Sequence, residues 1–309
     1  MDGVSFPLIV VRQVWKHNLL KEFDLIRIAG MTHRMVAFDT EFPGVVFSPI
    51  NIDKRELGKL PSFLNYNIIR DNVNATNIIQ LGLALCDDKG SLPNFGTKYQ
   101  YAWEFNFRDF DVYNDVQNQK SIELLKSQGI NFDKNLKEGI DSADFAALML
   151  KSGLLGNHSA FTWVTFHGAY DIAHLMKILI RQPLPYDLME FMDLMQWLFG
   201  KRLFDLKHMM KFCDGLYGGL ETVANRLGVE RLAGKSHQAG SDTLLTLQTF
   251  MKFLDVYFKE KNDGGLAHNG HLLTGMQCVL HGLELNNNHQ LNNAGLNLNL
   301  CRQSHVLCN

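Results

Sequence analysis

Apolar runs interrupted by turn residues predict a fold of alternating strands and helices. In the first third of the chain, strands are expected at Met35–Phe42, Asn77–Cys86 and Lys98–Phe107. The second of these is almost wholly apolar, which is typical of a strand covered on both faces. Two shorter strands are expected at Phe161–His167 and Leu203–Leu206. Together the pattern predicts an α/β fold built on a mixed sheet.

Apolar residues that recur every three or four positions predict the helices. Helices are expected at Trp15–Ala29, Ser121–Gln128, Tyr170–Arg181, Leu188–Phe199, Gly219–Leu227 and from Gly240 to about Lys259. A further helix is expected to begin after Asp141, which serves as its N-cap. Residues 44–75 show no period and are predicted to be irregular. This stretch is long for a loop in a compact domain, so we expect it to contain a short helix or to contact substrate.

Length and composition favour a single folded domain. A chain of 309 residues that is 46% hydrophobic can bury one large core. From about Leu285 the composition changes, because residues 286–309 contain eight asparagines and no helical or strand period. We therefore predict one domain over residues 1–284 and a disordered, asparagine-rich tail over residues 285–309.

Charge and cysteine content exclude several classes of protein. The net charge of −2 gives no global basic field, so a polyanionic substrate would have to be held locally by cations and a few basic side chains. Five scattered cysteines without a CxxC pair argue against a disulfide framework and against structural zinc. No run approaches the ~18 apolar residues of a membrane span, so we expect no membrane contact and an intracellular setting.

Asp39 and Glu41 are acidic residues within an apolar strand. Because side chains alternate along a strand, the two carboxylates should point to the same face. A pair spaced in this way can hold a cation. The alternatives are a solvated sheet face or a helix cap.

Three further residues extend this acidic set. Asp171 follows the apolar stretch Phe161–Phe166, where it could cap the next helix, bind a metal, or do both. His237 and Asp242 lie at the start of the last predicted helix, where a histidine paired with an acid is a candidate general base. Several buried carboxylates need a counter-charge, so their convergence predicts a metal site.

The wording of four motifs identifies a family resemblance. FDTEFPG, SIELLK, FHGAYD and HQAGSD occupy residues 38–44, 121–126, 166–171 and 237–242. Their order resembles the histidine-containing DEDD exonucleases and, more narrowly, the CAF-type poly(A) ribonucleases, the deadenylase subunits of CCR–NOT complexes. The resemblance covers about residues 9–283. It implies an RNase H-like mixed sheet of five strands flanked by helices.

The resemblance also implies an activity and its cofactors. It implies 3′–5′ hydrolysis of poly(A) tails on mRNA with release of 5′-AMP, using two divalent ions, Mg²⁺ or Mn²⁺. In this scheme Asp39 bridges the ions, while Asp171 binds one of them. Glu41 and Asp242 bind the ion on the side of the nucleophile, and His237 accepts a proton from water. The residues alone leave open a DNA-directed exonuclease or an adaptor subunit.

Substrate contacts and partners complete the expectations. The implied partners are single-stranded RNA with a 3′ poly(A) end, a NOT-type scaffold and a second, CCR-type deadenylase, with locations in cytoplasm and nucleus. Phe42 and Phe47 could stack on adenines or could be core residues. Lys235 could contact phosphate or could be an unpaired surface lysine.

Overall fold

A mixed sheet of six strands forms the centre of the computed structural model, which describes residues 8–48, 60–258 and 270–285. The strands follow the order β1-β4-β3-β2-β5-β6. Their bounds are Leu8–Val14, Met35–Glu41, Gln80–Cys86, Tyr99–Asn106, Thr162–Thr165 and Leu203–Asp205 for β1 to β6. The pairs β1–β4, β2–β5 and β5–β6 are parallel, and β3 runs antiparallel to β2 and β4.

The five predicted strands are confirmed, but the predicted total of five is wrong. Strand β1 is additional and pairs in parallel with β4, from Leu8 opposite Tyr99 to Val14 opposite Phe105. It lies at the edge of the sheet, where one side of a strand has no neighbour. Its partner lies far along the chain, so no local hairpin signal accompanies it.

Helices cover both faces of the sheet. Their bounds are Leu19–Ala29 (α1), Ser62–Ala75 (α2), Gln119–Ser127 (α3), Phe132–Glu138 (α4), Ser142–Lys151 (α5), Ala169–Ile180 (α6), Leu188–Phe199 (α7), Leu206–Met209 (α8), Leu220–Arg226 (α9), Ala239–Tyr257 (α10) and Gly270–Gly275 (α11), with a 3₁₀ turn at Met210–Phe212. Helix α2 has 14 residues, so the expected alternative of a helix within residues 44–75 is confirmed, although this helix is longer than the short one predicted. Helices α4, α8 and α11 were not predicted.

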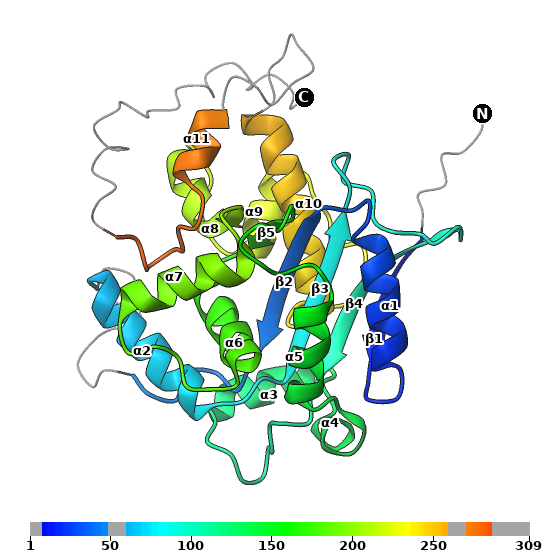
Figure 1. Ribbon diagram of the computed structural model, residues 1–309, viewed down its shortest axis with the longest axis vertical. Helices are drawn as coiled ribbons and strands as arrows, with labels where there is room; N and C mark the ends of the chain where they lie inside the picture. The colour runs from blue at the N-terminus through cyan, green and yellow to red at the C-terminus, as the bar shows by residue number, and fades with distance from the viewer. Residues whose placement is uncertain (1–7, 49–59, 259–269, 286–309) are drawn as a thin grey trace.

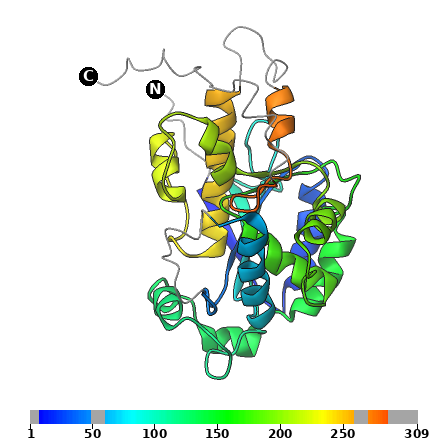
Figure 2. The same cartoon turned by 90° about the vertical axis from the view of Figure 1, so that its left-hand side faces the viewer.

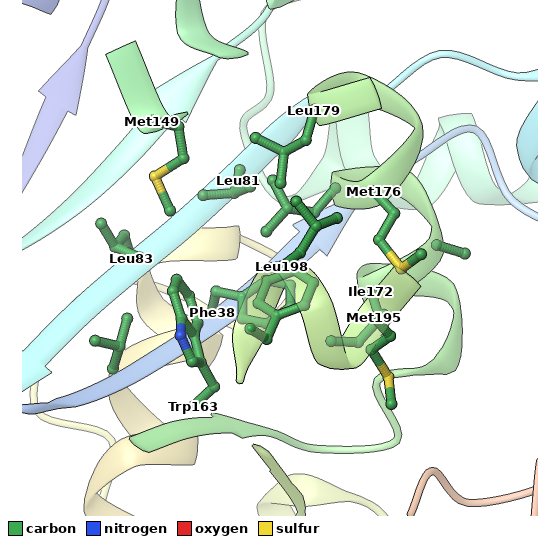
Figure 3. Close-up of a cluster of buried hydrophobic side chains, with 14 of the residues drawn as sticks. Phe38, Leu81, Leu83, Met149, Trp163, Ile172, Met176, Leu179, Met195 and Leu198 are labelled. Atoms are coloured by element: carbon green, nitrogen blue, oxygen red, sulfur yellow. The ribbon is translucent and has the colours of Figure 1, made fainter. Parts of the chain in front are cut away.

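The two faces carry separate cores. On one face α1, α2, α5, α6 and α7 pack against the sheet, and on the other lies α10 with α8 and α9 (Figures 1 and 2). The first core contains Phe38 and Trp163 from neighbouring strands, whose rings meet edge to face at 5.7 Å (Figure 3). Among the helices that the structure describes, none could span a membrane.

Gly82 allows α10 to approach the sheet closely. A Cβ atom at this position of β3 would lie 2.0 Å from the carbonyl oxygen of Ala239 and 2.3 Å from Oγ1 of Thr243. Backbone atoms cannot yield as a flexible side chain can. The missing side chain of Gly82 therefore sets the depth at which the first turn of α10 rests on the sheet.

Gly82→Ala is expected to lower the free energy of unfolding by about 1–3 kcal/mol, the usual cost of overpacking a tight contact. Urea unfolding would measure this loss. Gly219→Ala is the control, because a Cβ atom there would have no neighbour within 4 Å. Equal stability of Gly82→Ala and the unmodified protein would contradict the close contact.

Candidate active site

Strand β2 presents two carboxylates to the face that α10 covers. Asp39 lies opposite Gly82 and Glu41 opposite Gln80 in the antiparallel pair with β3. Both acids are half-buried, whereas Thr40 between them is buried and points to the other face. The predicted shared face is confirmed, and the alternative of a solvated sheet surface does not hold.

Asp171 joins this strand from α6. The carboxylate is buried, and its Oδ1 accepts hydrogen bonds from the Thr40 backbone N–H at 2.9 Å and from the Thr40 hydroxyl at 2.6 Å. The N-cap position of α6 belongs to Gly168, so the interpretation of Asp171 as the helix cap is wrong. Thr40 thus fixes the third acid beside the other two.

His237 and Asp242 come from the start of α10. The backbone N–H of His237 donates to Oδ2 of Asp242 at 3.0 Å, and His237 itself adopts a left-handed conformation with φ of 59°. One ligand atom each from Glu41, His237 and Asp242 lies within 4.8 Å of the others. The segment that opens α10 therefore meets β2 at the same end of the sheet as Asp171.

Arg231 is a site residue that the sequence did not reveal. Its Nη1 lies 2.6 Å from Oδ1 of Asp242 and donates to Oγ of Ser241 at 2.6 Å, while Nη2 lies 2.7 Å from Oε2 of Glu221. The guanidinium therefore links α9 to the first turn of α10 and orients Asp242. No local period or motif spacing marks such a contact.

Mutual repulsion and burial make the group of acids electrostatically strained. Burial raises the pKa values of Asp39 and Glu41 well above their ordinary range, and neighbouring carboxylates raise them further. Burial also raises the pKa of Asp171 to about 6, against the opposing effect of its hydrogen bonds from Thr40. For Asp242 burial again raises the pKa, although Arg231 acts in the opposite direction. The electrostatic coupling of Asp39 to all three other acids indicates that the four converge.

This donor set fits hard divalent cations. Carboxylate oxygens are the ligands that Mg²⁺ and Mn²⁺ prefer, and a bound cation relieves the repulsion that raises the pKa values of these acids. Arg231 contacts one of the four, so most of the negative charge has no cationic partner within the part of the chain that the structure describes. The residues present therefore fit the predicted metal site.

The aromatic and basic candidates have different outcomes. Phe42 is half-buried and its ring packs against Tyr170 at 5.3 Å and His174 at 4.8 Å, so the packing interpretation describes it better. Phe47 is exposed and its ring remains a candidate for stacking. Lys235 is also exposed, beside the segment that carries His237.

Without metal, the four acids are expected to destabilise the folded protein as the pH rises. Each of the four acids has a folded-state pKa above its unfolded value, so the folded state holds protons more tightly. Their contribution to stability is then fully present below a pH of about 4 and declines through the range that includes the value of about 6 for Asp171. Burial lowers the pKa values of His174 and His281 to about 3 and about 4, so these two groups act in the opposite direction. Thermal unfolding in EDTA between pH 4 and pH 8 would measure this decline, and saturating Mg²⁺ should reduce it. A profile in EDTA identical to that of Asp39→Asn would contradict the convergence of the acids, because the histidines contribute equally to both proteins.

Comparison with known proteins agrees with this geometry. The sheet order and the helices on both faces define an RNase H-like fold. The sequence model of the family described as CAF1 family ribonuclease matches residues 14–147. A probable CCR4-associated factor 1 homolog 10 of Arabidopsis thaliana is 44% identical over 250 residues, which is 81% of this chain and 87% of that protein. The chain belongs to the CAF1 family of ribonucleases.

Further relatives cover nearly the whole described fold. The poly(A) ribonuclease pop2 of Schizosaccharomyces pombe is 38% identical over 268 residues, covering 87% of this chain and 76% of that protein. The structure of S. pombe Pop2p in its Mg²⁺- and Mn²⁺-bound form has a TM-score of 0.76 and 37% identity, covering 88% of this chain and 99% of that one. The structure of yeast CAF1 with the NOT1 MIF4G domain has a TM-score of 0.66 and 29% identity, covering 91% and 99%.

Proposed function

We propose that this ribonuclease shortens poly(A) tails of mRNA from the 3′ end, releasing 5′-AMP, as a catalytic subunit of a CCR–NOT type complex. The observation that carries the proposal is the convergence of Asp39, Glu41, Asp171 and Asp242 beside His237 in a chain of the CAF1 family. The name of the S. pombe relative supports poly(A) as the substrate.

The four acids would hold divalent cations, Mg²⁺ or Mn²⁺, and two ions are proposed. When bound, such ions would stabilise the negative charge that develops in the transition state on the phosphate under attack and on the leaving oxygen. Support comes from the donor chemistry and from the Mg²⁺- and Mn²⁺-bound form of S. pombe Pop2p. Asp39, whose pKa both Asp171 and Glu41 raise, would contribute to holding both ions, and Asp171 would hold one of them.

The chain's own groups would orient the reaction. Arg231 and the N–H of His237 each hold one oxygen of Asp242, so this carboxylate has a fixed orientation. The exposed imidazole of His237 can take the proton of the attacking water and return it to solvent. Thr40 holds Asp171 against β2 in the same way.

One time course tests the proposal. RNA with a 3′ oligo(A) end, labelled at the 5′ end in one sample and at the 3′ end in another, would be incubated with and without Mg²⁺. The expected result is stepwise shortening of the 5′-labelled RNA and immediate release of labelled AMP from the 3′ end, in Mg²⁺ only. Internal cleavage, or equal trimming of an oligonucleotide with a 3′ deoxyribose end, would contradict the proposal.

The proposed partners are a NOT-type scaffold and a second, CCR-type deadenylase, with activity in cytoplasm and nucleus. The complex of yeast CAF1 with the NOT1 MIF4G domain supports the scaffold. Co-purification of the tagged chain followed by mass spectrometry would test both partners, and fractionation of the same cells would test location.

A further inference from the structure

A fifth carboxylate, Glu104, lies beneath the candidate active site and has no role in the proposed chemistry. The residue is 4% exposed and stands on β4, opposite Gly82 of β3. Gly82 in turn lies opposite Asp39, so the two acids belong to one row across the sheet. Its hydrogen-bond donors are neutral amides, and burying an ionised acid without a counter-charge costs free energy. The position of Glu104 therefore calls for an explanation.

Glu104 accepts a hydrogen bond from the first turn of α10. The backbone N–H of Gly240 donates to its Oε2 at 2.9 Å. The N-cap residue Gln238 makes no side-chain capping bond, so the free N–H groups of this helix start depend on other acceptors, which are Oε1 of Gln80 for Ala239 and Glu104 for Gly240. A negative group at a helix N-terminus is also favoured by the helix dipole. Glu104 thus caps α10 from a different element.

The glycine of the HQAGSD motif allows this contact. A Cβ atom at Gly240 would lie 2.9 Å from Cβ of Glu104, 3.1 Å from its Oε2 and 2.5 Å from Cγ1 of Val11. Any larger residue would lift the first turn from β4. Asp242 lies two residues further along the same turn, so its position depends on the contact between Gly240 and Glu104.

A chain of amide hydrogen bonds fixes the chemical type of residue 104. Gln80 donates from Nε2 to Oδ1 of Asn106 at 2.8 Å, and Asn106 donates from Nδ2 to Oε1 of Gln13 at 3.1 Å. Both glutamines then donate to Oε1 of Glu104, Gln13 at 2.9 Å and Gln80 at 3.2 Å. Backbone contacts set the orientation of these amides: Oε1 of Gln80 accepts from the Ala239 N–H at 3.4 Å, and Nδ2 of Asn106 donates to the carbonyl oxygen of Val14 at 3.3 Å. In this orientation residue 104 accepts at both oxygens, which an ionised carboxylate can do and an amide cannot.

We infer that Glu104 is a positioning residue of the active site: it ends this chain of donors, caps α10 and so fixes Asp242 and His237 opposite Glu41. The inference rests on the proposed function in so far as those residues bind cations. Burial raises the pKa of Glu104, and the amide donors and the Gly240 N–H oppose that rise, while the charge of Asp242 adds to it. Its interaction with Glu41 places it within electrostatic reach of the site.

Two substitutions separate position from charge. Glu104→Gln keeps the size of the side chain but leaves a single oxygen, which cannot accept both from the two glutamines and from the N–H of Gly240. Glu104→Asp keeps the charge but shortens the reach to Gly240. The control is Glu22→Gln, because Glu22 is equally buried, accepts from Arg12 at 2.6 Å and from Trp103 at 3.1 Å, and faces the other core.

Calorimetric titration with Mn²⁺ and hydrogen exchange of the Gly240 amide are the measurements. Both Glu104 variants are expected to bind Mn²⁺ about tenfold more weakly, the lower end of the usual effect of groups that orient metal ligands. Their Gly240 amide should exchange faster in EDTA, and Glu22→Gln should change neither quantity. In the activity assay, kcat should fall while KM stays constant.

Contrary outcomes point to different failures. Wild-type affinity and unchanged Gly240 exchange in both Glu104 variants would overturn the positioning role and leave the proposed function standing. Weakened binding in Glu104→Gln with unchanged Gly240 exchange would also overturn it, in favour of an effect of charge. Absence of Mn²⁺ binding by the unmodified protein would instead refute the proposed function, and the exchange of Gly240 would still decide whether Glu104 seats α10.

Discussion

Asp39→Asn is expected to reduce RNA hydrolysis by about 10³-fold or more. Removing one carboxylate from a divalent cation site forfeits several kcal/mol of charge stabilisation in the transition state, and ~4 kcal/mol corresponds to about 10³-fold in rate. The assay is the rate of AMP release from oligo(A) RNA at saturating Mg²⁺. Asp24→Asn is the matched control, because Asp24 is an exposed acid on α1 that pairs with Arg27 at 2.6 Å.

The same substitution should stabilise the protein when metal is absent. At neutral pH the carboxylate of Asp39 suffers burial and repulsion from its neighbours, and asparagine removes both penalties. In EDTA at pH 7 the variant should therefore melt at a higher temperature than the unmodified protein, and Mg²⁺ should raise its melting temperature less. Inactivity combined with lower stability in EDTA would indicate a folding defect. Mg²⁺-dependent trimming at the normal rate would remove Asp39 from the site.

His237→Asn is expected to lower kcat by about 10²- to 10⁴-fold, the usual contribution of a general base. Asparagine is the better test than alanine, since His237 has a φ of 59° and asparagine tolerates the left-handed region. The N–H bond of residue 237 to Asp242 then remains available. Single-turnover rates as a function of pH would show the loss of one titrating group.

Mn²⁺ affinity separates two roles for this imidazole. A ring nitrogen of His237 lies within 4.8 Å of carboxylate oxygens of both Glu41 and Asp242, close enough for a ligand as well as for a base. If His237 acts as the base, His237→Asn should react more slowly and should bind Mn²⁺ with unchanged affinity in calorimetric titration. Loss of affinity in parallel with rate would show that His237 is a ligand, and the assignment as base would then be wrong.

The sequence predicted the strands and helices in which apolar residues repeat every two or every three to four positions. Strand β2 and helix α7 have the expected positions, because alternation and a 3.6-residue repeat are written within a few neighbouring residues. Asp39 and Glu41 stood out because each interrupts an apolar strand. Strand β1 lacked such a signal, since its pairing with β4 is a contact between distant segments.

Residues that act through distant contacts were harder to predict. Glu104 interrupts the aromatic run AWEFNF in the same way that Asp39 interrupts its own strand, so the signal was present in the sequence. A periodic pattern could not predict the hydrogen bonds that the amide side chains make to Glu104. It also could not predict the contact of Gly240 with this residue of β4. Arg231 carries no such mark, because an arginine in a polar loop is usual.

The late position of α10 in the chain has a consequence during synthesis. Glu41 and Asp171 leave the ribosome well before His237 and Asp242, which belong to the helix that seals the second core. A nascent polypeptide that ends before this helix lacks two of the five residues proposed for the active site, His237 and Asp242. We therefore expect such a polypeptide to lack nuclease activity until α10 has been made and has packed on the sheet.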